Sequence, residues 1–485
     1  MNLELFIPEI VLAATAVLVI LLDLFVRSSA VLRYTSLLGL LAAAGVSIAM
    51  WGNRELGFNG MLAADNFAMF FNVLFAGTSI IIVLASADYA EKFKRFRGEY
   101  YALILLSTLG MSLMAATTNL VAIYVSLELA SLALYVLVGF LRDAQSTEAS
   151  LKYLLLGAAA SAVLLYGMAL VFGVTGSTSL GGIVTALEDI SLSGFMDNPA
   201  LFMGVVMLIA GLGFKIAAVP FHLWVPDVYE GAPTTVTAYL SVASKAAGFA
   251  VVLRIFHTSL QSPALLSETW GMIFAVLAVL GMFLGNTAAI PQKNIKRMLG
   301  YSSIAQAGYM LVGLAALGYA GAGGTAGQSG VIFFLAAYAL TNLGAFTAII
   351  IASRSTGSDL IEDYAGLGKR APLLALALTL CLVSLTGIPP AAGFMGKFYL
   401  FSGAVDNGLL WLVVIAAINS VISAYYYLRV VKVMWFNEPK STEKVTSSLL
   451  PRIALFICCL GVLFFGIVPG ALMRLAELAS KMVGF

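Results

Sequence analysis

Residues 118–140 read TNLVAIYVSLELASLALYVLVGF, an uninterrupted apolar stretch that contains a single charged residue, Glu128. A helix of this length crosses the hydrocarbon core of a bilayer, which is about 30 Å thick. Glu128 lies far from both ends of the stretch, so its carboxyl group cannot reach the water on either side. It could serve as a structural ion pair or a hydrogen-bonded neutral acid, but an isolated acid at this depth is first of all a functional candidate.

The composition of the whole chain agrees with this first stretch. Of 485 residues, 61% are hydrophobic and only 10% are charged, and the mean hydropathy is +1.00. Soluble proteins keep about a quarter of their residues charged. The net charge of +2 and the scattered basic residues argue against nucleic-acid binding. We therefore predict an all-α polytopic membrane protein.

About fourteen apolar runs are long enough to span a membrane. The first run lacks a basic leader and a small-residue cleavage site, so we expect a true span rather than a cleaved signal. The runs fall near residues 4–26, 33–51, 66–86, 99–116, 118–140, 152–174, 201–223, 235–257, 268–290, 301–320, 330–353, 371–401, 409–436 and 451–476.

The charges between these runs predict the orientation of the chain. If both termini lie outside, most of the 26 Lys and Arg residues fall in inside loops, as the positive-inside rule requires. Lys92, Lys94, Arg95 and Arg97, after the third run, are an example of such a loop. A missed helix would reverse this bias for everything after it. With both termini outside, the outside loops hold only four basic residues: Arg54, Arg254, Arg474 and Lys481.

Three lysines fall inside predicted spans: Lys215, Lys245 and Lys397. A lysine near the bilayer centre costs several kcal/mol, about 3 on insertion scales, so it is retained where it lines a hydrated path or pairs with an acid. Desolvation disfavours the charged form of an ionisable group, which favours proton exchange at such depths. Lys245, flanked by small residues in YLSVASKAAGFAVVL, is expected to be a relay site. A purely structural role is the weaker alternative for all three.

Two of these lysines lie beside predicted helix breaks. Lys215 precedes the break in LIAGLGFKIAAVPFHLWVPD, and Lys397 follows the break in LTGIPPAAGFMGKFYLF. Free backbone groups at mid-depth are tolerated where they line a cavity. The two breaks fall in the seventh and twelfth runs, an odd offset that indicates an inverted repeat, as in secondary transporters.

Other polar residues are weaker candidates. Lys152 lies near the inside end of its helix and could reach the interface, so a relay role and a structural role are equally favoured. His222, beside the first break, could shuttle protons or form a structural hydrogen bond. Glu9 and Asp23 lie near the ends of the first span, and we expect both to face the headgroups.

The sequence shows no redox or metal site. Cys381, Cys458 and Cys459 have no C-x-x-C spacing, and iron–sulfur clusters usually need four cysteines. With only two histidines, paired haem ligands are not expected. The Gly-rich stretch GAGGTAG at 321–327 precedes no Lys-Ser or Lys-Thr, so a phosphate loop is not predicted. We expect no cofactor to be bound by this chain.

Three stretches carry a resemblance to a known family. KIAAVPFHLWVPDVYEGAPTTVTAYLSVASKAA (215–247), QKNIKRMLGYSSIAQAGYML (292–311) and GIPPAAGFMGKFYL (387–400) closely resemble the antiporter-like, proton-conducting membrane subunits of respiratory complex I, NADH–quinone oxidoreductase. PFHLWVPDVYEGAP is most similar to the N branch of that family. The L and M branches more usually read P-L-H-x-W-L-P-x-A-H-x-x-A-P, and a lysine at 397 also departs from the M branch.

The resemblance implies a fold and a set of roles. It implies a fourteen-helix core with three N-terminal helices (1–98), a five-helix repeat (99–260), an inverted repeat (261–436) and a C-terminal helix (437–485). Glu128 and Lys215 match the family's coupled acid and base, Lys245 its central relay, and Lys397 its outer exit. NADH, FMN, iron–sulfur clusters and quinone are then expected in partner subunits. Those partners would include the antiporter-like subunit M and the small subunits J and K.

The implied setting is a bacterial inner membrane, with lipid around the chain and protons and water as the transported species. One alternative is a subunit of a multisubunit cation/proton antiporter, which uses similar membrane chemistry without electron transfer, or of a related membrane-bound redox complex. A stand-alone solute carrier is a more distant alternative, because no polar or aromatic binding cluster accompanies the breaks.

Overall fold

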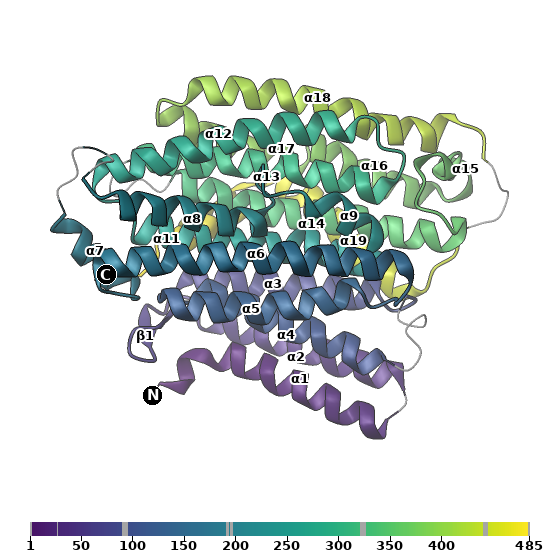
Figure 1. Cartoon of the computed structure of the whole chain (residues 1–485). Coiled ribbons are helices and arrows are strands. Elements are labelled where there is room, and N and C mark those ends of the chain that lie inside the picture. The colour runs from purple at the N-terminus through teal and green to yellow at the C-terminus, as the bar shows by residue number, and fades with distance from the viewer. Residues whose placement is uncertain are drawn as a thin grey trace.

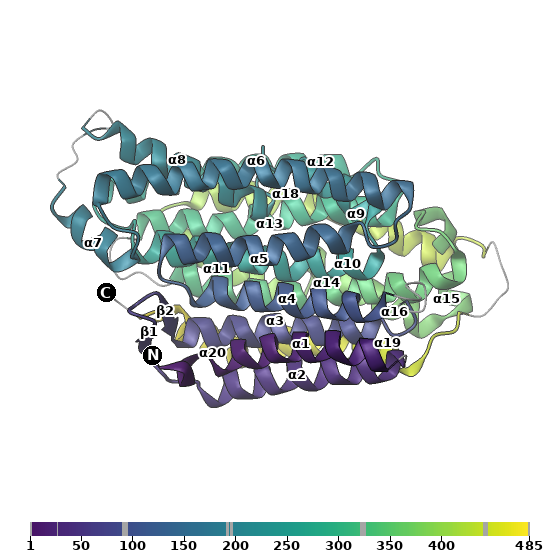
Figure 2. The same cartoon turned by 60° about the horizontal axis from the view of Figure 1, so that its bottom comes forward.

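The computed structural model of the chain is a bundle of long helices that run side by side (Figures 1 and 2). It describes residues 2–26, 28–89, 96–190, 194, 197–320, 326–439 and 445–483. Lys92, Lys94, Arg95 and most of the Gly-rich stretch lie outside these residues. Both ends of the chain lie at the same end of the bundle, which we call the terminal face (Figures 1 and 2).

The described helices follow the predicted apolar runs closely. They are α1 (Ile7–Phe25), α2 (Ser29–Ala49), α3 (Asn66–Ala85), α4 (Arg97–Ala116), α5 (Leu120–Val138), α6 (Ala144–Thr175), α7 (Leu180–Glu188), α8 (Pro199–Ile216), α9 (Trp224–Gly231), α10 (Thr234–Tyr239), α11 (Lys245–Thr258), α12 (Ala264–Ala289), α13 (Ile295–Tyr319), α14 (Ala326–Thr356), α15 (Leu367–Arg370), α16 (Pro372–Thr386), α17 (Ala392–Asp406), α18 (Leu410–Phe436), α19 (Leu449–Ile467) and α20 (Gly470–Ser480). Short helices η1 (Leu3–Phe6) and η4 (Ile361–Tyr364), the π-helical turn η3 (Leu240–Ser244) and strands β1 (Glu55–Gly57) and β2 (Leu62–Ala64) complete the described elements.

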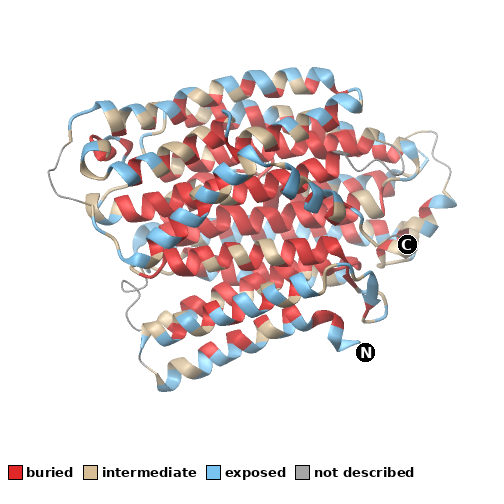
Figure 3. Cartoon of the chain, turned by 180° about the vertical axis from the view of Figure 1, so that it is seen from behind, coloured by how far each residue is buried: buried red, intermediate tan, exposed pale blue. Residues whose placement is uncertain are grey.

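Burial follows the distance from the centre of the bundle. α11 is buried from Lys245 to Phe256, and α14 is buried almost throughout. The peripheral helices instead expose large apolar side chains, and Phe25, Leu373 and Phe436 are 80–83% exposed. Figure 3 shows this gradient from the buried centre to the exposed rim. In water such a surface would be unfavourable, whereas in a bilayer it meets lipid.

The predicted all-α polytopic membrane fold is confirmed. In the described part of the chain, twelve helical segments are long and apolar enough to cross a membrane. α13 and the pair α16–α17 run through the same bundle (Figure 1). The expected count of fourteen, the inverted repeat and the domain boundaries stay predictions.

Both predicted helix breaks are present. α8 ends at Ile216, Ala217 is left-handed with φ +61°, and α9 begins only at Trp224. α16 ends at Thr386, Gly387 has φ +90°, and α17 begins at Ala392. Gly387 permits this positive φ, and a Cβ atom there would make a tight contact of 3.0 Å with Cδ of Lys397.

The structure corrects three expectations. The run 451–476 is not one helix, because α19 ends at Ile467 and α20 starts after Pro469. Glu9 does not face the headgroups: it is 4% exposed, and Asn72 donates a hydrogen bond of 2.8 Å to its Oε1. Arg254 does not belong to an outside loop, since it lies in α11 and is fully buried. Hydropathy averages over a window and therefore cannot detect a charge that pairs inside the bundle.

Candidate functional site

Glu128 and Lys215 lie on neighbouring helices but do not touch. Glu128 projects from α5, and Ser161 of α6 donates a hydrogen bond of 2.5 Å to its Oε1. The Lys215 ammonium, 5% exposed, donates to Oγ of Ser131 at 2.5 Å. Ser131 lies one helical turn after Glu128 on α5. Within the described residues the acid and the lysine form no ion pair, so each is held by a serine.

The end of α8 provides a favourable place for a cation. Lys215 lies in the last turn of α8, where unpaired carbonyl groups give the helix a partial negative charge. The rings of Tyr135 and Tyr153 lie 5.8 and 6.0 Å from its Nζ and offer their electron-rich faces. The break in the helix thus stabilises the charge that the membrane disfavours.

Lys245 begins α11, and the first turn of α11 packs against the end of α8 that carries Lys215. Gly248, one turn further along α11, lies so close to α8 that a Cβ atom on it would be 3.3 Å from Cβ of Lys215. The Lys245 ammonium donates to the carbonyl oxygen and to Oγ of Ser303, both at 2.5 Å. Lys245 is 2% exposed and follows directly on the π-helical turn η3.

Ser303 of α13 is the meeting point of several elements. Its hydroxyl group lies 3.2 Å from the hydroxyl of Tyr229 on α9 and accepts a hydrogen bond of 3.1 Å from Tyr338 on α14. Together with Lys245, three helices therefore converge on one serine. All four side chains are buried.

Lys397 lies at the second break and is held by the end of α16. Its ammonium donates to the carbonyl oxygens of Leu385 (3.3 Å) and Thr386 (2.9 Å) and to Oγ of Ser420 on α18 (2.8 Å). Its Nζ also lies 4.3 Å from the centroid of the Tyr309 ring. As at Lys215, the C-terminal end of a half-helix meets the cation.

Gln306 connects the two halves of the site. It lies one turn after Ser303 on α13, and its amide nitrogen donates at 3.0 Å to the carbonyl oxygen of Leu385. That same oxygen accepts from Lys397. Lys245 and Lys397 are thus both held next to α13, and Lys215 approaches α11 through the close packing at Gly248. We call this succession of buried polar groups, from Lys215 through Lys245 to Lys397, the polar row.

The two secondary candidates lie off this row. Lys152 is 43% exposed and pairs with Glu148 and Asp227, both at 2.8 Å, at the face opposite the termini. His222 is 6% exposed in the loop between α8 and α9, and its Nδ1 has no partner among the described residues. No role of either residue in proton transfer is tested by these contacts.

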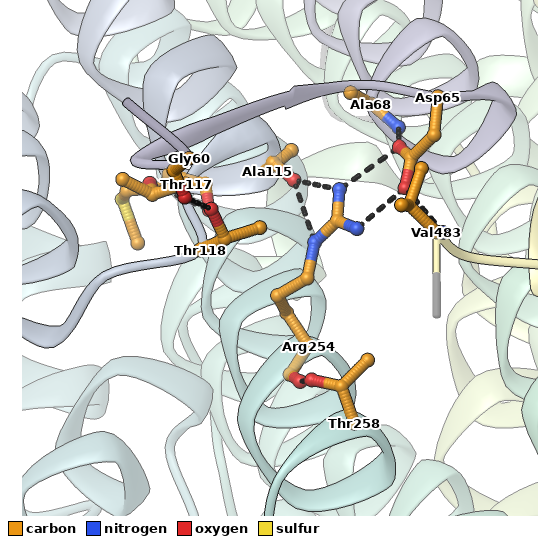
Figure 4. Close-up of polar contacts among 10 residues, drawn as sticks. Gly60, Asp65, Ala68, Ala115, Thr117, Thr118, Arg254, Thr258 and Val483 are labelled. Atoms are coloured by element: carbon orange, nitrogen blue, oxygen red, sulfur yellow. Dashed lines mark hydrogen bonds and ion pairs between the residues drawn. The ribbon is translucent and has the colours of Figure 1, made fainter. Parts of the chain in front are cut away.

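Sequence reasoning missed a buried ion pair near the terminal face. Arg254 Nη1 and Nη2 donate to the two carboxylate oxygens of Asp65 at 2.6 and 3.0 Å, and both side chains are 0% exposed (Figure 4). Burial alone would raise the pKa of Asp65, but the charge of Arg254 and its hydrogen bonds lower the pKa below its usual range. Asp65 and Arg254 are 189 residues apart, so no local pattern could have joined them.

In the described part of the chain, no group of three or more His, Cys, Asp or Glu side chains is placed to hold a metal ion. The arrangement offers buried ammonium, carboxyl and hydroxyl groups in hydrogen-bonding series. Such groups hold and pass protons.

Comparison with known proteins agrees with this chemistry. A family described as NADH:quinone oxidoreductase/Mrp antiporter, TM, matches residues 117–423. NADH-quinone oxidoreductase subunit N of Dehalococcoides mccartyi is 53% identical over 486 residues, which cover 99% of this chain and 100% of the relative. A chain of respiratory complex I from Thermus thermophilus with bound Aureothin is 34% identical with a TM-score of 0.81, covering 96% of this chain and 99% of its own. A chain of the Mrp complex from Dietzia sp. has a TM-score of 0.87 at 20% identity, covering 99% of this chain and 97% of its own, and shares the fold.

Proposed function

Because the chain belongs to the NADH:quinone oxidoreductase/Mrp antiporter transmembrane family, we propose that it is the N-type proton-translocating membrane subunit of an NADH:quinone oxidoreductase. The observation that carries the proposal is that Lys215, Lys245 and Lys397 are all buried in the bundle and that each is held by hydroxyl or carbonyl groups. A membrane protein retains such groups where they serve transport.

The proposed cycle starts at Glu128 and Lys215. A change of charge in a neighbouring subunit, set off by quinone chemistry elsewhere in the complex, brings the acid and the lysine together or lets them separate. In the separated arrangement each is held by its own serine, as found here. The change at Lys215 then shifts a proton towards Lys245.

The second half of the cycle runs from Lys245 to Lys397. Ser303 and Gln306 supply the hydrogen-bonding groups between them. Lys397 then releases its proton to the outside. The terminal face is the outer side in this scheme, and the membrane is the bacterial inner membrane.

In this proposal the chain contributes proton transfer and no electron transfer. NADH, FMN, iron–sulfur clusters and quinone would be bound by partner subunits, among them neighbours of the M, J and K types. Lys152 and His222 are proposed as secondary groups near the inner side and near the first break.

The proposal is tested by Lys215→Met in the assembled complex. We expect NADH oxidation to lose its coupling to proton translocation, because the switch has lost its base. Lys432→Met, at an exposed position on α18, is the matched control and should pump normally. Full proton stoichiometry in Lys215→Met would overturn the assignment.

A cation/proton antiporter subunit is the second candidate, and the shared fold with the Mrp complex chain favours it. The two functions differ in their partners. Purification of this chain with iron–sulfur subunits supports the oxidoreductase, and purification with antiporter subunits alone supports the second candidate.

A further inference from the structure

The two ends of α11 differ in polarity. Lys245, at its start, contacts Ser303, which in turn contacts Tyr229 and Tyr338. The eight residues that follow, from Ala246 to Leu253, have no polar side chain, and all are buried. The helix rises about 1.5 Å per residue, so Arg254 lies roughly 13 Å along α11 from Lys245, towards the terminal face. We call the apolar stretch between them the dry segment.

Arg254 closes the far end of the dry segment. Its guanidinium binds Asp65 through two nitrogens, and it donates twice to the carbonyl oxygen of Ala115 on α4, from Nε at 3.2 Å and from Nη2 at 2.7 Å. Asp65 in turn accepts from the backbone N–H groups of Ala68 and Val483 (Figure 4). The cation is thus held in place by α3, α4 and the C-terminal segment.

A guanidinium is unsuited to passing a proton. It has five N–H donors, no acceptor atom, and stays charged under all ordinary conditions. A fixed cation also repels hydronium, as the arginine of some channel proteins does. The side chains of α11 between Lys245 and Arg254, and the guanidinium that ends this segment, therefore supply no group that accepts a proton.

We propose that Arg254, held in position by Asp65, is a seal whose fixed guanidinium prevents protons on Lys245 from leaving directly towards the terminal face. This inference rests on the proposed function, because it explains how protons are kept on the row towards Lys397. Arg254 acts by position and charge, and it takes no part in proton transfer itself.

The size of the effect follows from distance. A unit charge about 13 Å from a second one, at an effective dielectric constant of about 20, changes the occupancy of that position about tenfold. Arg254→Gln leaves the Asp65 carboxylate unpaired and so changes the net charge of the site by one unit, which should raise passive proton flow about tenfold. The double variant keeps the site neutral and should leak less, through the space that the guanidinium leaves.

The test measures passive proton influx into liposomes that hold the whole complex, without NADH, from a trapped pH-sensitive dye under a potassium diffusion potential. Arg254→Gln removes the cation, whereas Asp65→Asn breaks the same ion pair but keeps the cation. The double variant Asp65→Asn/Arg254→Gln is neutral at both positions and avoids a buried unpaired charge. We expect leakage in Arg254→Gln and in the double variant, and none in Asp65→Asn.

Two outcomes would overturn the seal. Equal leakage in all three variants, Asp65→Asn included, would mean that the pair only holds the helices together. No leakage in any variant would mean that the dry segment suffices without the cation.

Lys245→Met separates the seal from the proposed function. Added to Arg254→Gln, it should abolish the leak, because the leak passes through Lys245; a leak that persists would overturn the seal. Alone, Lys245→Met should lose NADH-driven pumping. Normal pumping in Lys245→Met would contradict the proposed function. Lost pumping in Lys245→Met, combined with no passive proton leak in Arg254→Gln, would contradict the seal alone.

Discussion

The hydroxyl group of Ser303 offers the sharpest test of the polar row, because three helices depend on it. Ser303→Ala removes an acceptor of Lys245 and leaves the hydroxyl groups of Tyr229 and Tyr338 without this partner. The carbonyl oxygen of residue 303 still accepts from Lys245, so the lysine stays in position. The substitution therefore breaks the link while keeping the ammonium where it is.

The energetic cost can be worked out from these contacts. A hydrogen bond to a charged group contributes about 1.5–3 kcal/mol and a neutral one about 0.5–1.5 kcal/mol. One charged and two neutral bonds therefore predict a loss of stability of about 4 kcal/mol. The neighbouring Ser302, also buried, bonds to the hydroxyl group of Tyr427, a neutral contact, so Ser302→Ala should cost about 1 kcal/mol.

The assay compares both variants in the purified complex, by thermal unfolding and by proton translocation per NADH oxidised. Ser303→Ala should unfold at the lower temperature and translocate protons more slowly, whereas Ser302→Ala should pump at the normal rate. Ser303→Thr keeps the hydroxyl group and should restore most of the pumping. Equal behaviour of the two alanine variants in both measurements would refute the assignment of Ser303 as the meeting point.

Three further predictions concern the second break, the buried pair and the exit lysine. Gly393→Ala would place a Cβ atom 2.0 Å from a carbonyl oxygen of α16, so we expect poor assembly of the complex. Gly173→Ala, where a Cβ atom meets nothing within 4 Å, is the control and should assemble normally. Equal yields of assembled complex from the two variants would contradict the close approach at Gly393. Because the pKa of Asp65 is lowered, its ion pair with Arg254 stabilises the fold fully above about pH 3.9, the ordinary value, and this contribution is lost as the pH falls through the lower folded value. Thermal unfolding should then show a difference between wild type and Asp65→Asn that shrinks below pH 4, and a constant difference would argue against the pair. Lys397→Met should abolish proton pumping with little loss of stability, about 1 kcal/mol, because each carbonyl that accepts from Lys397 keeps a second donor. Normal pumping in this variant would exclude Lys397 from the proton path.

The membrane fold and the breaks could be predicted because their causes are local. An apolar run of sufficient length must form a helix in a bilayer, where backbone groups find no water. The breaks follow from Gly387, Pro389 and Pro390 in one case and from Pro220 in the other, since proline lacks the N–H group and glycine allows a positive φ. The buried lysines stood out for the same reason, as charges that nothing nearby neutralises.

The groups between the lysines could not be predicted. Serine, tyrosine and glutamine occur widely in this chain, and nothing near Ser303 or Gln306 in the sequence distinguishes them from the others. Their role comes from contacts with Lys245 and Leu385, which lie on other helices. The same limitation placed Arg254 in a loop and Glu9 at the headgroups.

The sequence by itself thus determined that the chain lies in a lipid bilayer, where its helices and breaks fall, and which charged residues are unusual. It could do so because the free energy of transfer from water to lipid and the backbone geometry depend on each residue and its near neighbours. Tertiary structure alone decided which polar groups meet: Ser131 with Lys215, Ser303 with Lys245, and Asp65 with Arg254. These meetings depend on how helices far apart in the chain pack against one another. A charged residue in an apolar stretch shows from the sequence that it requires a polar partner, but only the packing of the helices determines which residue that partner is.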